Sequence, residues 1–277
     1  MEKRRLDTLL AERGLFPSRS RAAASVMAGE VFLESAAPGE RRASKPGELV
    51  DVATRVRLVE RAAFVSRGGV KLANALAACG LSVRGRRALD VGSSTGGFTD
   101  CLLQQGAREV IAVDVGYGIL DYRLRIDPRV QVMERTNARA LEPQMLPAGV
   151  ADLSGELPDL ATIDVSFISL AKVLGAVLGC LASGYDVLAL VKPQFEVGRG
   201  RVGKGGVVRD PDDRRAALIE VGKSALDLGA AVLGYHSSEL PGPKGNRETF
   251  IWLADPAATP GAGDERELET LAREVEP

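Results

Sequence analysis

A glycine-rich turn between a predicted strand and a predicted helix constrains the fold of this chain more than any other feature. The turn lies within Asp90-Val-Gly-Ser-Ser-Thr-Gly-Gly-Phe-Thr99, after the apolar run 88–91 and within a segment whose helical pattern covers 98–105. Glycine permits a left-handed backbone and lets a ligand approach the main chain closely. A strand, a glycine turn and a helix in this order indicate a parallel α/β sheet with a cofactor site at the carboxyl end of the strand.

Strand and helix patterns continue to alternate as far as residue 255. Short apolar runs predict strands, and apolar residues at helical spacing predict helices. The predicted strands cover 88–91, 110–114, 130–132, 160–164, 187–191, 231–235 and 249–253, and the predicted helices cover 68–78, 98–105, 170–181 and 211–228. This alternation predicts an α/β fold of the Rossmann-like type, with a mostly parallel sheet covered by helices on both faces.

The first 59 residues predict a separate, smaller α/β module. Helical patterns cover 6–14 and 19–27, strands are expected at 31–33 and 51–59, and the stretch 36–47 is rich in turn residues. Residues 1–67 hold thirteen basic and nine acidic side chains, a net charge of +4, whereas the whole chain carries −1. A basic module beside an acidic domain fits a polyanion-binding unit attached to an enzyme, and a solvated charged surface is the plainer alternative.

Two further segments complete the expected domain organisation. Residues 60–66 are expected to be a linker between the small module and a catalytic domain at 67–255. Residues 256–277 are first rich in proline, glycine and alanine and then highly charged, so we expect a frayed tail or a short exposed helix there.

The spacing around the glycine turn favours S-adenosylmethionine over a dinucleotide. A dinucleotide fingerprint reads G-x-G-x-x-G, whereas this turn has Gly92 and then Gly96-Gly97, with Asp90 placed to lie near a cationic methionine end. Asp114 ends the next strand 22 residues after Gly92. This spacing suits an acid that accepts hydrogen bonds from ribose hydroxyls. The predicted cofactor-binding residues are Asp90, Gly92, Ser93, Ser94, Thr95, Gly96, Gly97, Phe98, Thr99, Asp114 and Asn137.

The segment Gly198-Arg-Gly-Arg-Val-Gly-Lys-Gly205 is similar in sequence to a phosphate-binding P-loop. It lacks the Ser or Thr that should follow Lys204 to hold magnesium, and it follows a loop instead of a strand. We therefore expect a mobile basic loop near the active site, which contacts RNA phosphates or acts as a lid.

Four charged residues are predicted to converge on the crevice at the carboxyl ends of the strands. Asp164 and Lys192 each end a predicted strand, Glu248 precedes the last strand, and Lys71 opens the helix before the glycine turn. A single charged residue at the end of a strand usually lies in solvent, but four at one crevice indicate a reaction site. A sulfonium methyl group is already activated, so the reaction needs a base or orienting donor for an alcohol acceptor and no metal. Asp164-Val-Ser-Phe stands where amino-methyltransferases have Asn/Asp-Pro-Pro-Tyr, which disfavours methylation of a base nitrogen.

The cysteine and histidine content predicts neither disulfides nor a metal site. Cys79, Cys101 and Cys180 are odd in number, widely spaced and in apolar stretches, and His236 is the single histidine. The N-terminus lacks the apolar core of a signal peptide, and the most apolar stretch, 171–191, is interrupted by Ser183-Gly-Tyr-Asp186. We expect a cytoplasmic protein with no metal and no membrane partner.

Strings of residues throughout the chain resemble the TlyA (hemolysin A) family. They are Ser66-Arg-Gly-Gly-Val-Lys71, the glycine turn with Asp100, Asp164-Val-Ser-Phe-Ile-Ser169, Val191-Lys-Pro-Gln-Phe-Glu196, Val202-Gly-Lys-Gly-Gly-Val-Val-Arg-Asp210 and Pro241-Gly-Pro-Lys-Gly-Asn-Arg-Glu248. The resemblance implies a class I, FtsJ-like, S-adenosylmethionine-dependent methyltransferase that acts on cytidine 2′-hydroxyls of 16S and/or 23S ribosomal RNA. It also implies a catalytic tetrad, matched here by Lys71, Asp164, Lys192 and Glu248, in which Lys192 orients or deprotonates the hydroxyl and the other three position it.

The small module resembles an S4-like RNA-binding domain, through Arg4-Arg-Leu-Asp7, Pro17-Ser-Arg-Ser-Arg21 and Met27-Ala-Gly-Glu-Val31. The chain departs from that pattern at Leu33-Glu-Ser-Ala-Ala-Pro, where a strand running toward an Asn-Gly turn is usual. The predicted RNA-binding residues are Arg4, Arg5, Arg19, Arg21, Arg67 and Lys204. The expected partner is ribosomal RNA or a ribosomal subunit. A cytolysin, a non-catalytic ribosome-binding protein, and methylation of a base or small molecule stay open as alternatives, as does the oligomeric state.

Overall fold

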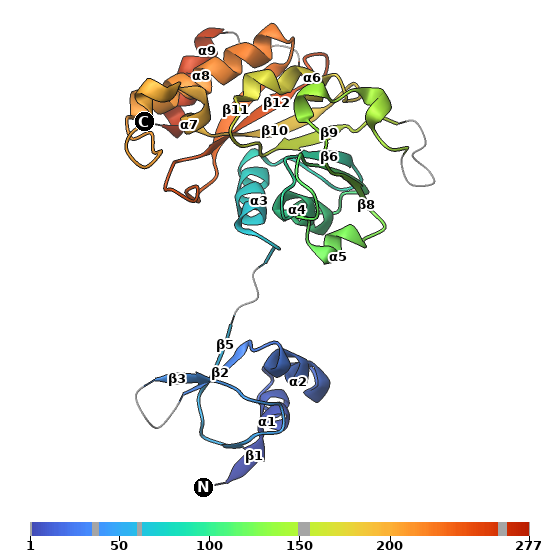
Figure 1. Ribbon diagram of the computed structural model, residues 1–277, viewed down its shortest axis with the longest axis vertical. Helices are drawn as coiled ribbons and strands as arrows, with labels where there is room; N and C mark the ends of the chain where they lie inside the picture. The colour runs from blue at the N-terminus through green and yellow to red at the C-terminus, as the bar shows by residue number, and fades with distance from the viewer. Residues whose placement is uncertain (1, 35–38, 60–62, 149–155, 260–264, 277) are drawn as a thin grey trace. The chain divides into compact units, whose positions relative to one another are not determined.

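The computed structural model describes residues 2–34, 39–59, 63–148, 156–259 and 265–276 (Figure 1). The chain divides into two compact units, Met1–Ala62 and Ala63–Pro277. Residues 60–62 of the expected linker lie outside the described residues. Phe64 and Val65, from the same stretch, pack against the core of the larger unit, and the backbone N–H of Val65 donates to Asp100 Oδ2 at 2.8 Å.

The small unit combines two short helices with antiparallel strands. One sheet pairs β1 (Lys3–Arg5) with β4 (Leu49–Asp51), and the other has the order β3 (Glu40–Arg42), β2 (Val31–Glu34), β5 (Val56–Leu58). The helices are α1 (Leu6–Glu12) and α2 (Arg19–Met27). Their apolar faces and the inward side of β2 form one core, in which Leu6, Leu10, Ala22, Val31 and Leu33 are buried.

The strand predicted at 51–59 is instead two strands separated by a turn. The backbone N–H of Thr54 donates to the carbonyl of Asp51 at 2.9 Å, and the N–H of Ala53 donates to the Asp51 carboxylate at 2.8 Å. An aspartate that bonds the backbone two residues ahead stabilises a turn against a continuous strand.

The large unit is built on a seven-stranded sheet with the order β11-β12-β10-β9-β6-β7-β8. Its strands are β6 (Arg87–Val91), β7 (Glu109–Val113), β8 (Val130–Met133), β9 (Leu160–Ile163), β10 (Asp186–Val191), β11 (Ala231–Ser237) and β12 (Thr249–Ala254). The five strands β6 to β10 pair in parallel, and β12 pairs antiparallel with β10 and β11. Every predicted strand of this unit is present, and the mostly parallel sheet is confirmed.

Helices cover both faces of this sheet (Figure 1). They are α3 (Arg67–Cys79), α4 (Gly97–Gln104), α5 (Tyr122–Arg125), α6 (Leu174–Leu178), α7 (Pro193–Glu196), α8 (Pro211–Asp227) and α9 (Glu265–Val275), with short turns η1 (Ala138–Ala140), η2 (Pro143–Met145), η3 (Leu170–Lys172) and η4 (Arg199–Arg201). Alternate strand residues point to opposite faces. Ala88 therefore belongs to the core under α3 and α4, whereas Leu89 belongs to the core under α6, α8 and α9.

The helix predicted at 170–181 is shorter and broken. It consists of η3 and α6, with Val173 between them at φ −116°, far from the φ of about −63° of a regular α-helix. No helix among the described residues is long and apolar enough to cross a membrane.

The expected C-terminal tail is a packed helix, which corrects the prediction of a frayed or exposed segment. Leu268 and Ala272 of α9 are fully buried and join the same core as α8 and β11. Their spacing of four residues places them on one face of the helix. The high charge of this segment belongs to the other faces, so composition alone concealed the apolar one.

Candidate active site

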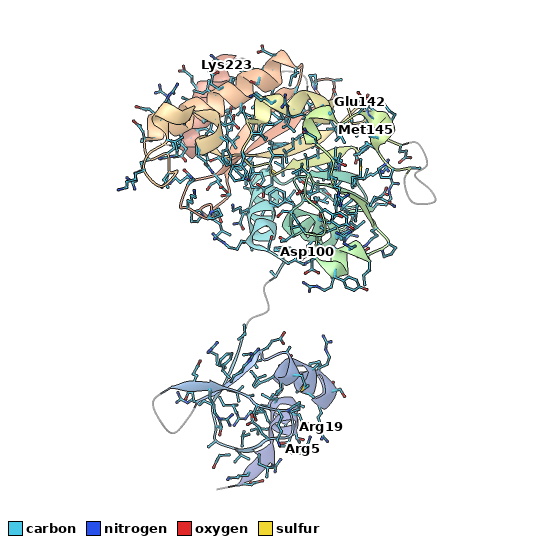
Figure 2. The ribbon with its side chains drawn as sticks, in the orientation of Figure 1. Arg5, Arg19, Asp100, Glu142, Met145 and Lys223 are labelled. Carbon is cyan, nitrogen blue, oxygen red and sulfur yellow. The ribbon has the colours of Figure 1, made fainter. Side chains whose placement is uncertain are left out.

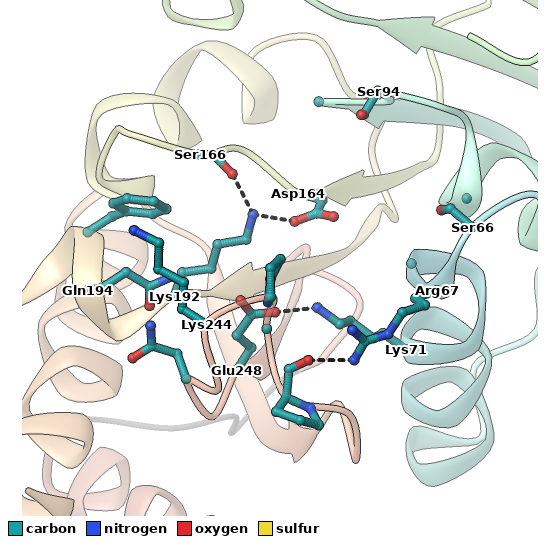
Figure 3. Close-up of a pocket in the computed structure, with 18 of the residues that line it drawn as sticks. Ser66, Arg67, Lys71, Ser94, Asp164, Ser166, Lys192, Gln194, Lys244 and Glu248 are labelled. Atoms are coloured by element: carbon teal, nitrogen blue, oxygen red, sulfur yellow. Dashed lines mark hydrogen bonds and ion pairs between the residues drawn. The ribbon is translucent and has the colours of Figure 1, made fainter. Parts of the chain in front are cut away.

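Two ion pairs lie beyond the carboxyl ends of the central strands (Figure 3). Lys71 of α3 and Glu248, which precedes β12, are buried, and Lys71 Nζ contacts Glu248 Oε2. Asp164 follows β9 and Lys192 follows β10, and their Oδ1 and Nζ atoms are 2.7 Å apart. Because β9 and β10 are neighbouring parallel strands, their ends place Asp164 and Lys192 side by side. The structure thus arranges the predicted tetrad as two lysine–carboxylate pairs.

A single cavity of about 700 Å³ connects the two pairs. All four residues of the tetrad line it, together with two parts of the glycine turn, 92–95 and 97–98. This volume lies within the range of about 300–1,000 Å³ that small-molecule sites occupy. The cavity therefore has room for a cofactor next to the charged pairs.

Backbone geometry explains why the turn requires glycine at two positions. Gly92 has φ +84°, and a Cβ there would lie 2.6 Å from the carbonyl oxygen of Asp164. Gly97 approaches α3 as closely, because a Cβ there would lie 2.9 Å from the backbone nitrogen of Gly69. The N–H of Ser94 donates to Asp114 Oδ2 at 2.7 Å, which ties the turn to the end of β7. The turn presents bare main chain to the cavity, as a tightly held cofactor requires.

Comparison with known proteins shows which family the chain belongs to. Residues 64–255 match the model of the FtsJ-like methyltransferase family. The 16S/23S rRNA (cytidine-2′-O)-methyltransferase TlyA of Mycobacterium tuberculosis is 48% identical over 251 residues, which cover 90% of this chain and 89% of that protein. The chain belongs to the TlyA family of FtsJ-like methyltransferases.

Other similar proteins extend the likeness to the whole chain. YqxC of Bacillus subtilis is 44% identical over 279 residues, which cover 99% of this chain and 94% of that protein. A solved structure from Streptococcus thermophilus, named for a hemolysin, is 40% identical with a TM-score of 0.67 and covers 99% of this chain and 96% of that one. The predicted class I methyltransferase fold is confirmed, and S-adenosylmethionine is the methyl donor of this TlyA-family enzyme.

The predicted cofactor residues of the TlyA-family site divide into two groups. Gly92, Ser93, Ser94, Thr95, Gly97 and Phe98 line the cavity, whereas Asp90, Gly96, Thr99, Asp114 and Asn137 do not. Gly96 has φ +95°, and a Cβ there would lie 2.2 Å from Leu124 Cδ1, so packing requires the glycine. Asn137 caps η1 through a bond of 3.1 Å from the N–H of Arg139.

Asp90 differs most from its expected role beside the cationic methionine end. Its side chain is fully buried, and it accepts hydrogen bonds from Thr99 Oγ1 at 2.6 Å and Thr162 Oγ1 at 3.1 Å. Burial raises the pKa of Asp90 to about 7. A buried carboxyl that is partly protonated near neutral pH is a poor counter-ion, so Asp90 fixes β6 to α4 and β9 beneath the turn.

The predicted RNA-binding residues of the large unit lie at the cavity and beside it. Arg67 lines the cavity and donates from Nη2 to the carbonyl of Pro241 at 2.8 Å. Lys204 is exposed and does not line it, although Val202 and Gly206 from the same loop do. This loop contains an antiparallel bridge between Gly203 and Val207, so it has local structure of its own.

The predicted arginines of the small unit are exposed and mostly paired with acids. Arg4 contacts Glu2 and Glu12, while Arg5 and Arg19 both contact Asp7, at 2.7 Å and 3.1 Å. Figure 2 labels Arg5 and Arg19 in this unit. The guanidinium of Arg5, with that of Arg19, holds the pKa of Asp7 well below its usual range despite burial. For Arg21 the structure shows a backbone bond to Ser18 Oγ.

Several residues that line the cavity were not singled out from the sequence. Ser166, Phe167, Gln194, Phe195, Lys244 and Asn246 lie in the family-specific strings beside the tetrad residues. Asn246 is buried, accepts from the N–H of Val208 at 2.9 Å and donates to the carbonyl of Gly206 at 2.8 Å. It therefore joins the loop before Glu248 to the loop after α7. The only available signal was proximity to a charged residue within each string.

Replacing Gly92 with alanine should weaken cofactor binding. The new Cβ would meet backbone at Asp164, and a left-handed alanine costs about 1–2 kcal/mol, so both the turn and Asp164 must shift. We expect a loss of at least about tenfold in S-adenosylmethionine affinity by calorimetry. Gly85→Ala is the matched control, because Gly85 has φ +77° with nothing within 4 Å of its Cβ position. Equal affinity of Gly92→Ala and wild type would contradict the role of the turn.

Proposed function

We propose that this enzyme methylates the 2′-hydroxyl of a cytidine in 16S and/or 23S ribosomal RNA. The observation that carries the proposal is the amine of Lys192, held by Asp164 in a cavity that the glycine turn also lines. Two relatives support the substrate class. The M. tuberculosis relative is named a 16S/23S rRNA (cytidine-2′-O)-methyltransferase, and a Campylobacter jejuni relative, 34% identical over 190 residues, is named a 23S rRNA (cytidine-2′-O)-methyltransferase.

The reaction needs help mainly at the acceptor hydroxyl. S-adenosylmethionine supplies a methyl group already activated by its sulfonium, so no metal has to polarise it. Lys192 Nζ orients the 2′-oxygen or accepts its proton as the carbon–oxygen bond forms. Asp164 holds Lys192, and the Lys71–Glu248 pair fixes the neighbouring wall of the cavity.

Backbone and polar groups of the turn would hold the cofactor. We assign Ser93, Ser94, Thr95, Gly97 and Phe98 to its binding, because these residues line the cavity. Asp114 would accept hydrogen bonds from the hydroxyls of the cofactor ribose. Its carboxylate lies at the end of β7, where it accepts a hydrogen bond from the N–H of Ser94.

Binding of RNA would involve both units. The unit Met1–Ala62 would act as an S4-like RNA-binding domain, with Arg4, Arg5, Arg19 and Arg21 contacting phosphates. A guanidinium has five N–H donors, so one ion pair leaves others for a phosphate. In the large unit, Arg67 and Lys204 would add phosphate contacts. Phe167, 91% exposed at the cavity, offers a ring face for an unstacked base.

Several similar proteins carry the hemolysin name, including Hemolysin A of Brachyspira hyodysenteriae, which is 38% identical over 244 residues. Methyl transfer explains why two lysine–carboxylate pairs and a glycine turn share one cavity. Cytolysis would require neither the lysine–carboxylate pairs nor the glycine turn, so we favour methyl transfer over cytolysis.

The test is transfer of labelled methyl groups to purified ribosomal subunits and to protein-free 16S and 23S RNA. The RNA is then digested to nucleosides and analysed by mass spectrometry. We expect 2′-O-methylcytidine from at least one of these substrates. Methyl groups on a base, or none on RNA beside lysis of liposomes by the same preparation, would contradict the proposal.

A further inference from the structure

The amine of Lys192 has two side-chain partners among the described residues. Its Nζ lies 2.7 Å from Asp164 Oδ1 and 2.9 Å from Ser166 Oγ (Figure 3). Both partners come from the loop that follows β9. Asp164 is a member of the tetrad, whereas Ser166 has no role in the mechanism given above.

The contact with Ser166 restricts how the amine of Lys192 can be oriented. A tetrahedral nitrogen has four bonding directions, and the bond to Cε occupies one of them. The hydrogen bond to Ser166 Oγ occupies a second, and Asp164 Oδ1 holds the amine at ion-pair distance without the geometry of a hydrogen bond. Lys192, Asp164 and Ser166 all line the cavity. With Asp164 as its only partner, the amine would turn about that contact and present different directions to the cavity.

We propose that Ser166 is a positioning residue, which together with Asp164 aims Lys192 Nζ at the 2′-oxygen. The inference rests on the proposed function and assigns a residue to it. It holds for both possible actions of Lys192. A protonated amine presents an N–H that Ser166 does not take, and a neutral amine presents its lone pair.

The loop that carries Ser166 is held at several points. Phe167, the next residue, has φ +65°, a left-handed conformation that a bulky side chain rarely adopts. Its ring lies 5.3 Å from that of Phe195. Farther along, the N–H of Leu170 donates to Glu196 Oε1 at 3.0 Å. A strained turn that contacts α7 at two points is a fixed support for the hydroxyl of Ser166.

The experiment compares Ser166→Ala, Ser166→Thr and Ser169→Ala with wild type. Ser166 is exposed, so its replacement should leave the fold intact. We expect Ser166→Ala to lower kcat about 10- to 100-fold, with KM for RNA and Kd for S-adenosylmethionine unchanged. Ser166→Thr, which keeps the hydroxyl, should recover most of the rate. Ser169 lies in the same loop and caps η3 without contacting Lys192, so Ser169→Ala should keep wild-type kcat.

A crystal structure of Ser166→Ala provides a readout that does not depend on activity. We expect Lys192 to keep its ion pair with Asp164 but to occupy more than one side-chain conformation. A single, unchanged position of Nζ, or a Ser166→Ala enzyme with wild-type kcat, would overturn the inference alone. Absence of 2′-O-methylcytidine with the wild-type enzyme would instead contradict the proposed function, and the crystal structure would still test Ser166.

Discussion

Replacing Lys192 with alanine should lower kcat by about 10²- to 10⁴-fold and leave the affinity for S-adenosylmethionine unchanged. The amine is the group that Asp164 and Ser166 hold in the cavity, and an unassisted hydroxyl is a weak nucleophile. Asp164 is about one-quarter exposed, so water can solvate it after the lysine is removed and the fold should persist. Single-turnover methyl transfer and calorimetric cofactor binding measure the two quantities separately.

Lys192→Arg separates the two possible actions of the amine. Arginine keeps the charge but is not deprotonated in proteins, so it can orient the oxygen but cannot accept its proton. An arginine variant as slow as the alanine variant indicates a base, and partial recovery indicates an orienting donor. Lys172→Ala is the control, because Lys172 is an exposed lysine of η3 outside the cavity. Wild-type kcat in Lys192→Ala would remove the catalytic assignment.

Local patterns predicted the strands of the large unit but not all of its helices or contacts. Each strand has its apolar run in the sequence, and parallel neighbours explain why Asp164 and Lys192 meet. The order of the strands was not predictable, because β10 lies between β9 and β12 and no local pattern encodes that arrangement. The pairing of Lys71 with Glu248 joins residues 177 positions apart and depends on that order.

Side-chain direction accounts for the clearest difference at the site. The alternation along β6 places Asp90 on the same face as Ala88, which packs under α4. Its carboxyl therefore meets Thr99 of α4 and not the cavity. A strand-end aspartate near a glycine turn suggests a ligand contact, and only the face it occupies reveals a structural role.

Replacing Glu248 with alanine should destabilise the large unit by about 3–5 kcal/mol. The side chain of Lys71 is 9% exposed, so removal of its partner leaves a nearly buried ammonium without compensation. The glutamate is also packed, because a Cβ at Gly242 would lie 2.2 Å from Glu248 Oε1. The free energy of unfolding, measured by urea titration at neutral pH, gives the effect.

Two comparisons identify buried charge as the cause of this destabilisation. Glu156→Ala removes the acid of the exposed Arg108–Glu156 pair in the same unit and should cost less than about 1 kcal/mol. The double variant Lys71→Met with Glu248→Met replaces both charges by apolar side chains of similar length. It should recover most of the stability lost in Glu248→Ala while remaining inactive, because an apolar pair needs no compensation in a low-dielectric site. If the double variant is as unstable as Glu248→Ala, the unpaired charge of Lys71 is not the cause of the destabilisation.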